Sequence, residues 1–140
     1  MKRLLLVIVL AAGAYFAYGR HDAATGMANQ PEPATAARIG SEASNAQVQG
    51  VGIVSRILPD DNDGSRHQRF ILRLQSGQTL LVAHNIDLAQ RIDDLKEGDT
   101  VEYSGEYQWN PKGGVVHWTH RDPSGRHVAG WLKHDGRVFQ

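Results

Sequence analysis

From Gln47 onward the chain alternates short apolar runs with clusters of turn-forming residues, and this rhythm restricts its fold more than any other feature. Within each run apolar and polar residues alternate, which is typical of strands with one buried face. Clusters of Gly, Pro, Asn and Asp separate the runs. The sequence therefore predicts a small all-β domain with strands near Val51–Leu58, Gln68–Leu74, Thr79–His84, Val101–Tyr107 and Val115–His120.

One segment between the third and fourth strands has helical spacing instead. Asn85 can cap a short helix near Ile86–Leu95, whose apolar side chains share one face. Three strands, one helix and two strands is the element order of the OB fold, a small five-stranded Greek-key barrel. Residues 131–139, which turn at Asp135-Gly136, add a C-terminal hairpin. An SH3-like barrel or a sandwich is the alternative fold.

The first 46 residues differ in character from this domain. After the basic start Met1-Lys2-Arg3, residues 4–18 carry no charge. As a helix they would span about 22 Å, less than the ~30 Å hydrocarbon core of a bilayer, so residues 1–19 are predicted to be a signal peptide. An uncleaved N-terminal anchor is the alternative. Residues 20–46 are predicted to be a flexible linker and residues 47–140 the folded domain.

This reading predicts a bacterial protein of the periplasm or the medium, with anchoring in the inner membrane as the alternative. The chain has 15 basic and 15 acidic residues, and two of the basic ones, Lys2 and Arg3, lie in the predicted signal peptide. A net-basic nucleic-acid binder is therefore not indicated, and a polyanion site would need a local patch. The chain has no cysteine, so any metal site must use histidines and carboxylates.

Strand pairing predicts which side chains of the second and third strands meet. If Ser76-Gly77 is a two-residue hairpin loop, Gln75 pairs with Gln78. Arg69 then lies opposite His84 on the outer face. A slip of one residue would reverse this assignment, because successive side chains of a strand point to opposite faces.

The turn at Asn110–Gly113 gives a second prediction of the same kind. It places Glu106 opposite His117 on the outer face, and Gly105 opposite Trp118 in the core. We also expect Tyr103 and Tyr107 to be buried.

Six of the seven histidines lie in the folded domain. Imidazole can bind metal or transfer protons near neutral pH. In an OB barrel the third and fifth strands are neighbours, so His84 is expected near His117 or His120. The candidate ligands for zinc or another divalent metal are His84, Glu106, His117, His120, Asp122 and His127. A polar cluster without metal is the alternative.

A further set of side chains predicts an anion-binding face. Arginine and lysine can contact phosphates, and an exposed tryptophan can stack on a base or a sugar ring. Surface ion pairs with Asp60, Asp61, Asp63 and Glu106 are the alternative role for the cations. The candidate ligand-binding residues are Arg66, Arg69, Arg73, Trp109 and Lys112.

Five short motifs are spread over residues 51–139. They are Leu58-Pro59-Asp60-Asp61, GSRHQRF at 64–70, HNIDLA at 84–89, GGVVHWTH at 113–120 and Gly130-Trp131-Leu132. Together they resemble a bacterial family catalogued as domain of unknown function 3465. The resemblance implies a small exported protein and supplies no activity.

Two main functions follow from these features. The first is an exported OB-like module that binds an anionic ligand, which could be nucleic acid, a glycan or a partner protein. The second is a small metal-dependent nuclease or phosphodiesterase, whose candidate catalytic residues are His67, His84, Glu106 and His117. A structural envelope protein is a third possibility. The chain has no Gly-x-Ser-x-Gly elbow and no phosphate-binding glycine loop.

Overall fold

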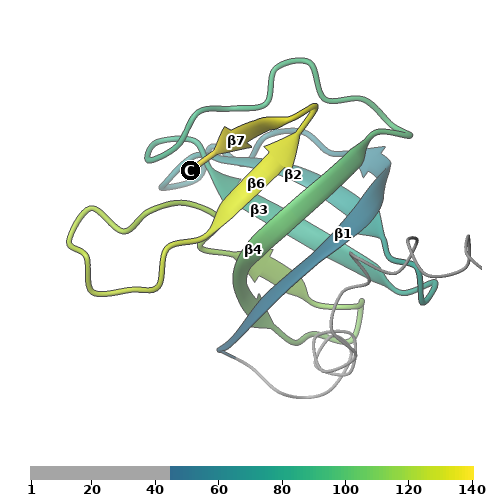
Figure 1. Ribbon diagram of the computed structural model, residues 1–140, viewed down its shortest axis with the longest axis horizontal. Helices are drawn as coiled ribbons and strands as arrows, with labels where there is room; N and C mark the ends of the chain where they lie inside the picture. The colour runs from purple at the N-terminus through teal and green to yellow at the C-terminus, as the bar shows by residue number, and fades with distance from the viewer. Residues whose placement is uncertain (1–44) are drawn as a thin grey trace, which may run out of the picture. The chain divides into compact units, whose positions relative to one another are not determined.

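The computed structural model describes residues 45–140, which form seven strands (Figure 1). The predicted signal peptide and nearly all of the predicted linker lie outside the described residues. No helix in the described part is long and apolar enough to span a membrane. The strands are β1 (Ala46–Ile57), β2 (His67–Arg73), β3 (Thr79–Asn85), β4 (Thr100–Gln108), β5 (Val115–His117), β6 (Trp131–His134) and β7 (Arg137–Phe139).

Five of these strands close into a barrel in the order β1-β2-β3-β5-β4, and β4 pairs back onto β1. The pairing of β3 with β5 is parallel, whereas the other pairs are antiparallel. β1 pairs with both β4 and β2, because a bulge between Val54 and Arg56 bends the strand. The OB-like barrel is confirmed, and so is the terminal hairpin, in which β6 extends the sheet along β4.

The barrel interior is filled by the apolar residues of the alternating pattern. Phe70, Leu72 and Val82 are fully buried, and the predicted burial of Tyr103 and Tyr107 is confirmed. Full burial of one such side chain contributes roughly 1.5–3 kcal/mol, so this interior is the main source of stability.

The predicted helix at Ile86–Leu95 is wrong, because the described residues contain no helix. Two of the backbone amides that a helix would use are bonded to side chains instead. The Asn85 side chain accepts the Asp87 N–H (2.9 Å), and the Gln68 side chain binds both the N–H and the carbonyl of Ile92 (2.9 and 2.8 Å). Ile92 is thereby held in the core as part of an irregular loop.

The β2–β3 hairpin also differs from the prediction. Its loop has three residues, Gln75–Gly77, and Gly77 has φ of +87°. A glycine at positive φ completes the usual three-residue hairpin loop. The pairing shifts by one position, so His84 lies opposite Gln68 instead of Arg69. This shift turns His84 from the outer face into the core.

The predicted pairing of Glu106 with His117 is confirmed. The predicted placement of Trp118 in the core is wrong, because β5 ends at His117 and Trp118 has φ of +54°. Trp118 is only half-buried, and Thr119 takes an inner position in its place.

Residues 118–130 form a wide loop between β5 and β6, at the left of Figure 1. β5 and β6 lie one after the other along β4, so the loop leaves and returns at nearly the same place. The Gly130 N–H donates to the His120 carbonyl (2.9 Å). A Cβ at Gly130 would overlap the carbonyl oxygens of Trp118 and Ser104, so only glycine fits there. The segment is an Ω-loop with joined ends.

His84 joins the barrel wall to two of these segments. Its Nε2–H donates to the Gln90 carbonyl (3.0 Å), so its Nδ1 accepts a hydrogen bond from the Thr119 hydroxyl (2.8 Å). Both ring nitrogens are satisfied in the neutral form. Burial lowers the pKa of His84 from 6.5 to about 4.

This buried histidine predicts a pH dependence of stability. As the pH falls below 6.5 the unfolded chain protonates His84, whereas the folded chain resists until about pH 4. The free energy of unfolding should therefore fall across this window, by up to about 3 kcal/mol at ~1.4 kcal/mol per pKa unit. Urea denaturation at several pH values measures the free energy of unfolding. His84→Gln keeps both hydrogen-bonding roles without titrating and should show a flatter profile; parallel profiles would contradict the assignment.

Candidate functional site

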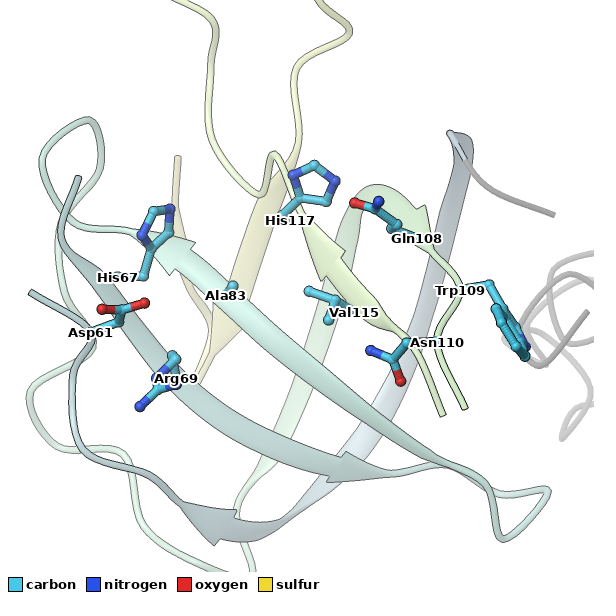
Figure 2. A pocket seen from close by; sticks show the side chains of 9 residues that line it. All are labelled: Asp61, His67, Arg69, Ala83, Gln108, Trp109, Asn110, Val115 and His117. Atoms are coloured by element: carbon cyan, nitrogen blue, oxygen red, sulfur yellow. The ribbon is translucent and has the colours of Figure 1, made fainter. Parts of the chain in front are cut away.

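The outer face of β2, β3 and β5 carries a pocket of about 410 Å³ (Figure 2). The β1–β2 loop and the β4–β5 loop contribute to its walls. In OB folds this face and these two loops are the usual place for a ligand, and the volume is in the range of small-molecule sites. The lining residues are Asp61, His67, Arg69, Ala83, Gln108, Trp109, Asn110, Val115 and His117.

Arg69 is the cation of this pocket, and its orientation is set by the backbone. Its Nε and Nη2 both donate to the Pro59 carbonyl (3.1 Å each). The remaining guanidinium hydrogens are not used by any ion pair within residues 45–140. Arg69 therefore offers a fixed positive group to a ligand.

The other predicted cations are arranged differently. Arg73 and Lys112 also form no ion pair within the described part of the chain, but they do not line the pocket. Arg66 is engaged, because its Nε lies 2.7 Å from a carboxylate oxygen of Asp87. The predicted pairing of these cations with Asp60, Asp61, Asp63 and Glu106 is not found in the described residues.

His67 and His117 both line the pocket, and Figure 2 shows their rings on the same side of the sheet. The Nδ1–H of His67 donates to the Ser65 carbonyl (2.8 Å), so in the neutral ring Nε2 remains an acceptor. Asp61 and His67 exchange two backbone hydrogen bonds (2.9 and 2.8 Å), which fold the β1–β2 loop back onto β2.

His117 has an unsatisfied ring nitrogen. Its Nε2 is buried without a hydrogen-bond partner in the described residues, and it lies 3.7 Å from Glu106 Oε1. Desolvation lowers the pKa of His117, which favours the neutral ring. A buried polar atom without a partner costs free energy, so this nitrogen marks a position where a ligand atom or water would be stabilising.

Glu106 is occupied by His127 of the Ω-loop. His127 Nε2 lies 2.5 Å from Glu106 Oε2, and its Nδ1 lies 2.8 Å from the Val128 carbonyl. Both nitrogens face acceptors, so the ring is held as the charged imidazolium, and the bond to Glu106 raises the pKa of His127. The indole of Trp118 stacks on the same ring at 3.9 Å. This contact ties the loop to the barrel.

Two further predicted metal ligands are used within the Ω-loop. The carboxylate of Asp122 accepts hydrogen bonds from the hydroxyl of Ser124 and from three backbone amides, which hold the pKa of Asp122 well below its usual range. His120 is buried, and its Nδ1 donates to the Arg121 carbonyl (2.7 Å).

The six predicted metal ligands therefore occupy three separate environments. His84 faces the core, Glu106, His117 and His127 meet outside the barrel, and His120 and Asp122 organise the loop. Among residues 45–140, the group of three acidic or histidine residues with ligand atoms within 4.8 Å of one another is Asp94, His134 and Asp135. Sequence reasoning missed this group because its members come together only through the pairing of β6 with β4.

The Glu106–His127 contact predicts a titration. The pKa of His127, measured by NMR of its ring protons, should lie above 6.5 and fall in Glu106→Gln. Because the folded pKa is raised, the stabilisation is complete below pH 6.5 and is lost as the pH rises through the folded pKa. Glu102→Gln, which removes a neighbouring outer-face carboxylate of β4, should leave His127 unchanged. A wild-type value below 6.5 would refute the imidazolium assignment.

Comparison with known families identifies the chain's relatives. Residues 26–140 match the family described as "Protein of unknown function (DUF3465)". The match covers the whole barrel and confirms the resemblance that the five motifs indicated. Comparison with curated proteins found no match. The chain therefore belongs to the bacterial family of domain of unknown function 3465.

Proposed function

We propose that the protein binds a phosphate-bearing ligand, most simply a single-stranded nucleic acid, in the outer pocket of β2, β3 and β5. The proposal rests on Arg69, a cation that lines the pocket, is oriented by Pro59 and has no carboxylate partner among residues 45–140. Guanidinium groups bind phosphate through paired hydrogen bonds. A binding role also agrees with a pocket that lies between the two loops that OB domains use.

The other cations extend this site along the barrel. Arg69 and Arg73 share the outer face of β2, about 13 Å apart at ~3.3 Å per residue. Arg73 pairs with Thr79, and Thr79 lies against Gly113, the neighbour of Lys112. The two cations outside the pocket therefore border the same end of the β2–β3 hairpin. A strand of phosphates could follow this row.

Two features suit the pocket to a nucleotide in particular. Trp109 lines it at the end away from Arg69 (Figure 2) and is partly buried against the core, so its ring is held in place. An aromatic ring held in this way can stack on a base. The charge of Glu106 is compensated by His127, which reduces its repulsion of a phosphate near His117.

This proposal predicts a salt-dependent affinity. Three phosphate contacts, from Arg69, Arg73 and Lys112, would give a slope near −2 in a log–log plot of affinity against salt, at about 0.7 per contact for single strands. Arg69→Ala should reduce the slope by about 0.7 and weaken binding by about tenfold or more. Fluorescence titration of a labelled single-stranded oligonucleotide measures both. Arg137→Ala removes the same charge from β7 and serves as the control.

No binding at low salt, or binding that Arg69→Ala leaves unchanged, would remove this face from consideration. A sulfated glycan that binds more tightly than the oligonucleotide would redirect the proposal toward glycans.

A second function is cleavage of the bound phosphodiester. His67 and His117 line one pocket with Arg69, and a neutral imidazole can act as a general base while a protonated one acts as a general acid. His84 faces the core and is not available at this face. The proposed cleavage therefore uses His67 and His117 rather than a metal ion held by the predicted ligands. An RNA oligonucleotide incubated with chelator should then be cleaved by the wild type and not by His117→Asn. Binding without any product would leave the binding role alone.

We propose further that the barrel is exported. The support is the uncharged stretch 4–18 after a basic start, which resembles a signal peptide. Intact mass of the protein from its native compartment tests this, because a cleaved signal removes about the first twenty residues. Full-length protein in the cytosol would contradict it.

A further inference from the structure

A second polar cluster lies where the β6–β7 hairpin meets the loop before β4. At its centre is His134, the last residue of β6, which is only 2% exposed. Its Nε2 lies 2.8 Å from Asp99 Oδ2 and 3.6 Å from Asp135 Oδ2, and its Nδ1 lies 3.8 Å from Asp94 Oδ1. Carboxylates from two segments thus converge on one buried ring, and none of them belongs to the outer pocket.

The hydrogen bond to Asp99 shows which nitrogen of the His134 ring carries a hydrogen. A carboxylate only accepts, so the Nε2 of His134 carries the hydrogen in the 2.8 Å contact. The same oxygen of Asp99 also accepts the Lys96 N–H (2.9 Å), which fixes the carboxylate. In the neutral ring Nδ1 then has a free lone pair, and no hydrogen bond within the described residues reaches it.

The carboxylates of Asp94 and Asp135 approach this ring at different nitrogens, Asp94 at Nδ1 and Asp135 at Nε2. Asp94 and Asp135 are exposed, and within residues 45–140 neither forms an ion pair with a lysine or an arginine. One ligand atom from each of Asp94, His134 and Asp135 fits within a span of 4.8 Å. Two carboxylates this close repel one another unless a cation or a proton joins them.

We propose that Asp94, His134 and Asp135 bind a divalent transition-metal ion of the zinc type. One imidazole nitrogen and two carboxylate oxygens are a donor set that suits such ions, whereas calcium and magnesium prefer oxygen ligands alone. Asp99 completes the arrangement, because metal-bound histidines usually donate their other ring N–H to a carboxylate. Three protein ligands leave at least one position for water.

Such an ion would join two segments of the fold. Asp94 belongs to the irregular loop that follows β3, and Asp135 to the turn of the terminal hairpin. The site shares no residue with the outer pocket, so this inference is independent of the proposed function.

The test is calorimetric titration of the chelator-treated full chain with zinc chloride at neutral pH. The wild type should bind one equivalent more than Asp94→Asn/Asp135→Asn, or bind that equivalent at least tenfold more tightly. Both asparagines replace exposed side chains, so the variant should fold, which circular dichroism checks. Asp63→Asn/Glu97→Gln removes two other exposed carboxylates and should retain the equivalent. His127→Gln should also retain it, because it alters only the outer cluster.

Two further measurements distinguish a metal site from a merely charged surface. Asp99→Asn still accepts the Lys96 N–H and should weaken zinc binding by about 10- to 100-fold, the usual effect of losing such a supporting carboxylate. The ring-nitrogen NMR signals of His134 should shift on addition of zinc. The proposal is overturned if the wild type binds no zinc, if the Asp94/Asp135 variant binds it equally well, or if calcium binds as tightly.

Discussion

The rest of the structure depends on the double pairing of β1. Its first part, Ala46–Ile53, pairs with β4, and its last part pairs with β2. The bulge after Val54 makes this possible, because an extra residue bends the strand from one neighbour to the other. The loop before β4 is attached at the same point, where Val54 exchanges hydrogen bonds with Asp99 and Gly98 (2.8 Å each). Barrel closure leaves an outer face on β2, β3 and β5 and places the β1–β2 and β4–β5 loops beside it.

Polar groups inside the barrel fix the conformation of the loop that follows β3. Gln68 and His84 are both buried, and each bonds the backbone of the segment that replaces the predicted helix. A buried polar group is costly unless it is paired, so these two side chains hold Gln90 and Ile92 in one conformation. The same constraint keeps His84 neutral and removes it from any outer site.

The surface carries two clusters of opposite character. The outer pocket presents Arg69 and two histidines, and Glu106 beside it forms an ion pair with His127. The cluster around His134 presents carboxylates that form no ion pair with a lysine or an arginine among the described residues. A positive cluster attracts anions and a negative cluster attracts cations. We therefore propose a phosphate-bearing ligand for the first cluster and a metal ion for the second.

The sequence by itself determined the number and order of the strands, the burial of Tyr103 and Tyr107, and the pairing of Glu106 with His117. These properties follow from alternation and turn residues, which act over a few neighbouring positions. Tertiary structure decided the β2–β3 register, the outward turn of Trp118, and the meeting of Asp94, His134 and Asp135. Each of these depends on contacts between distant segments, and a change of one residue in a loop reverses the face of every side chain in a strand.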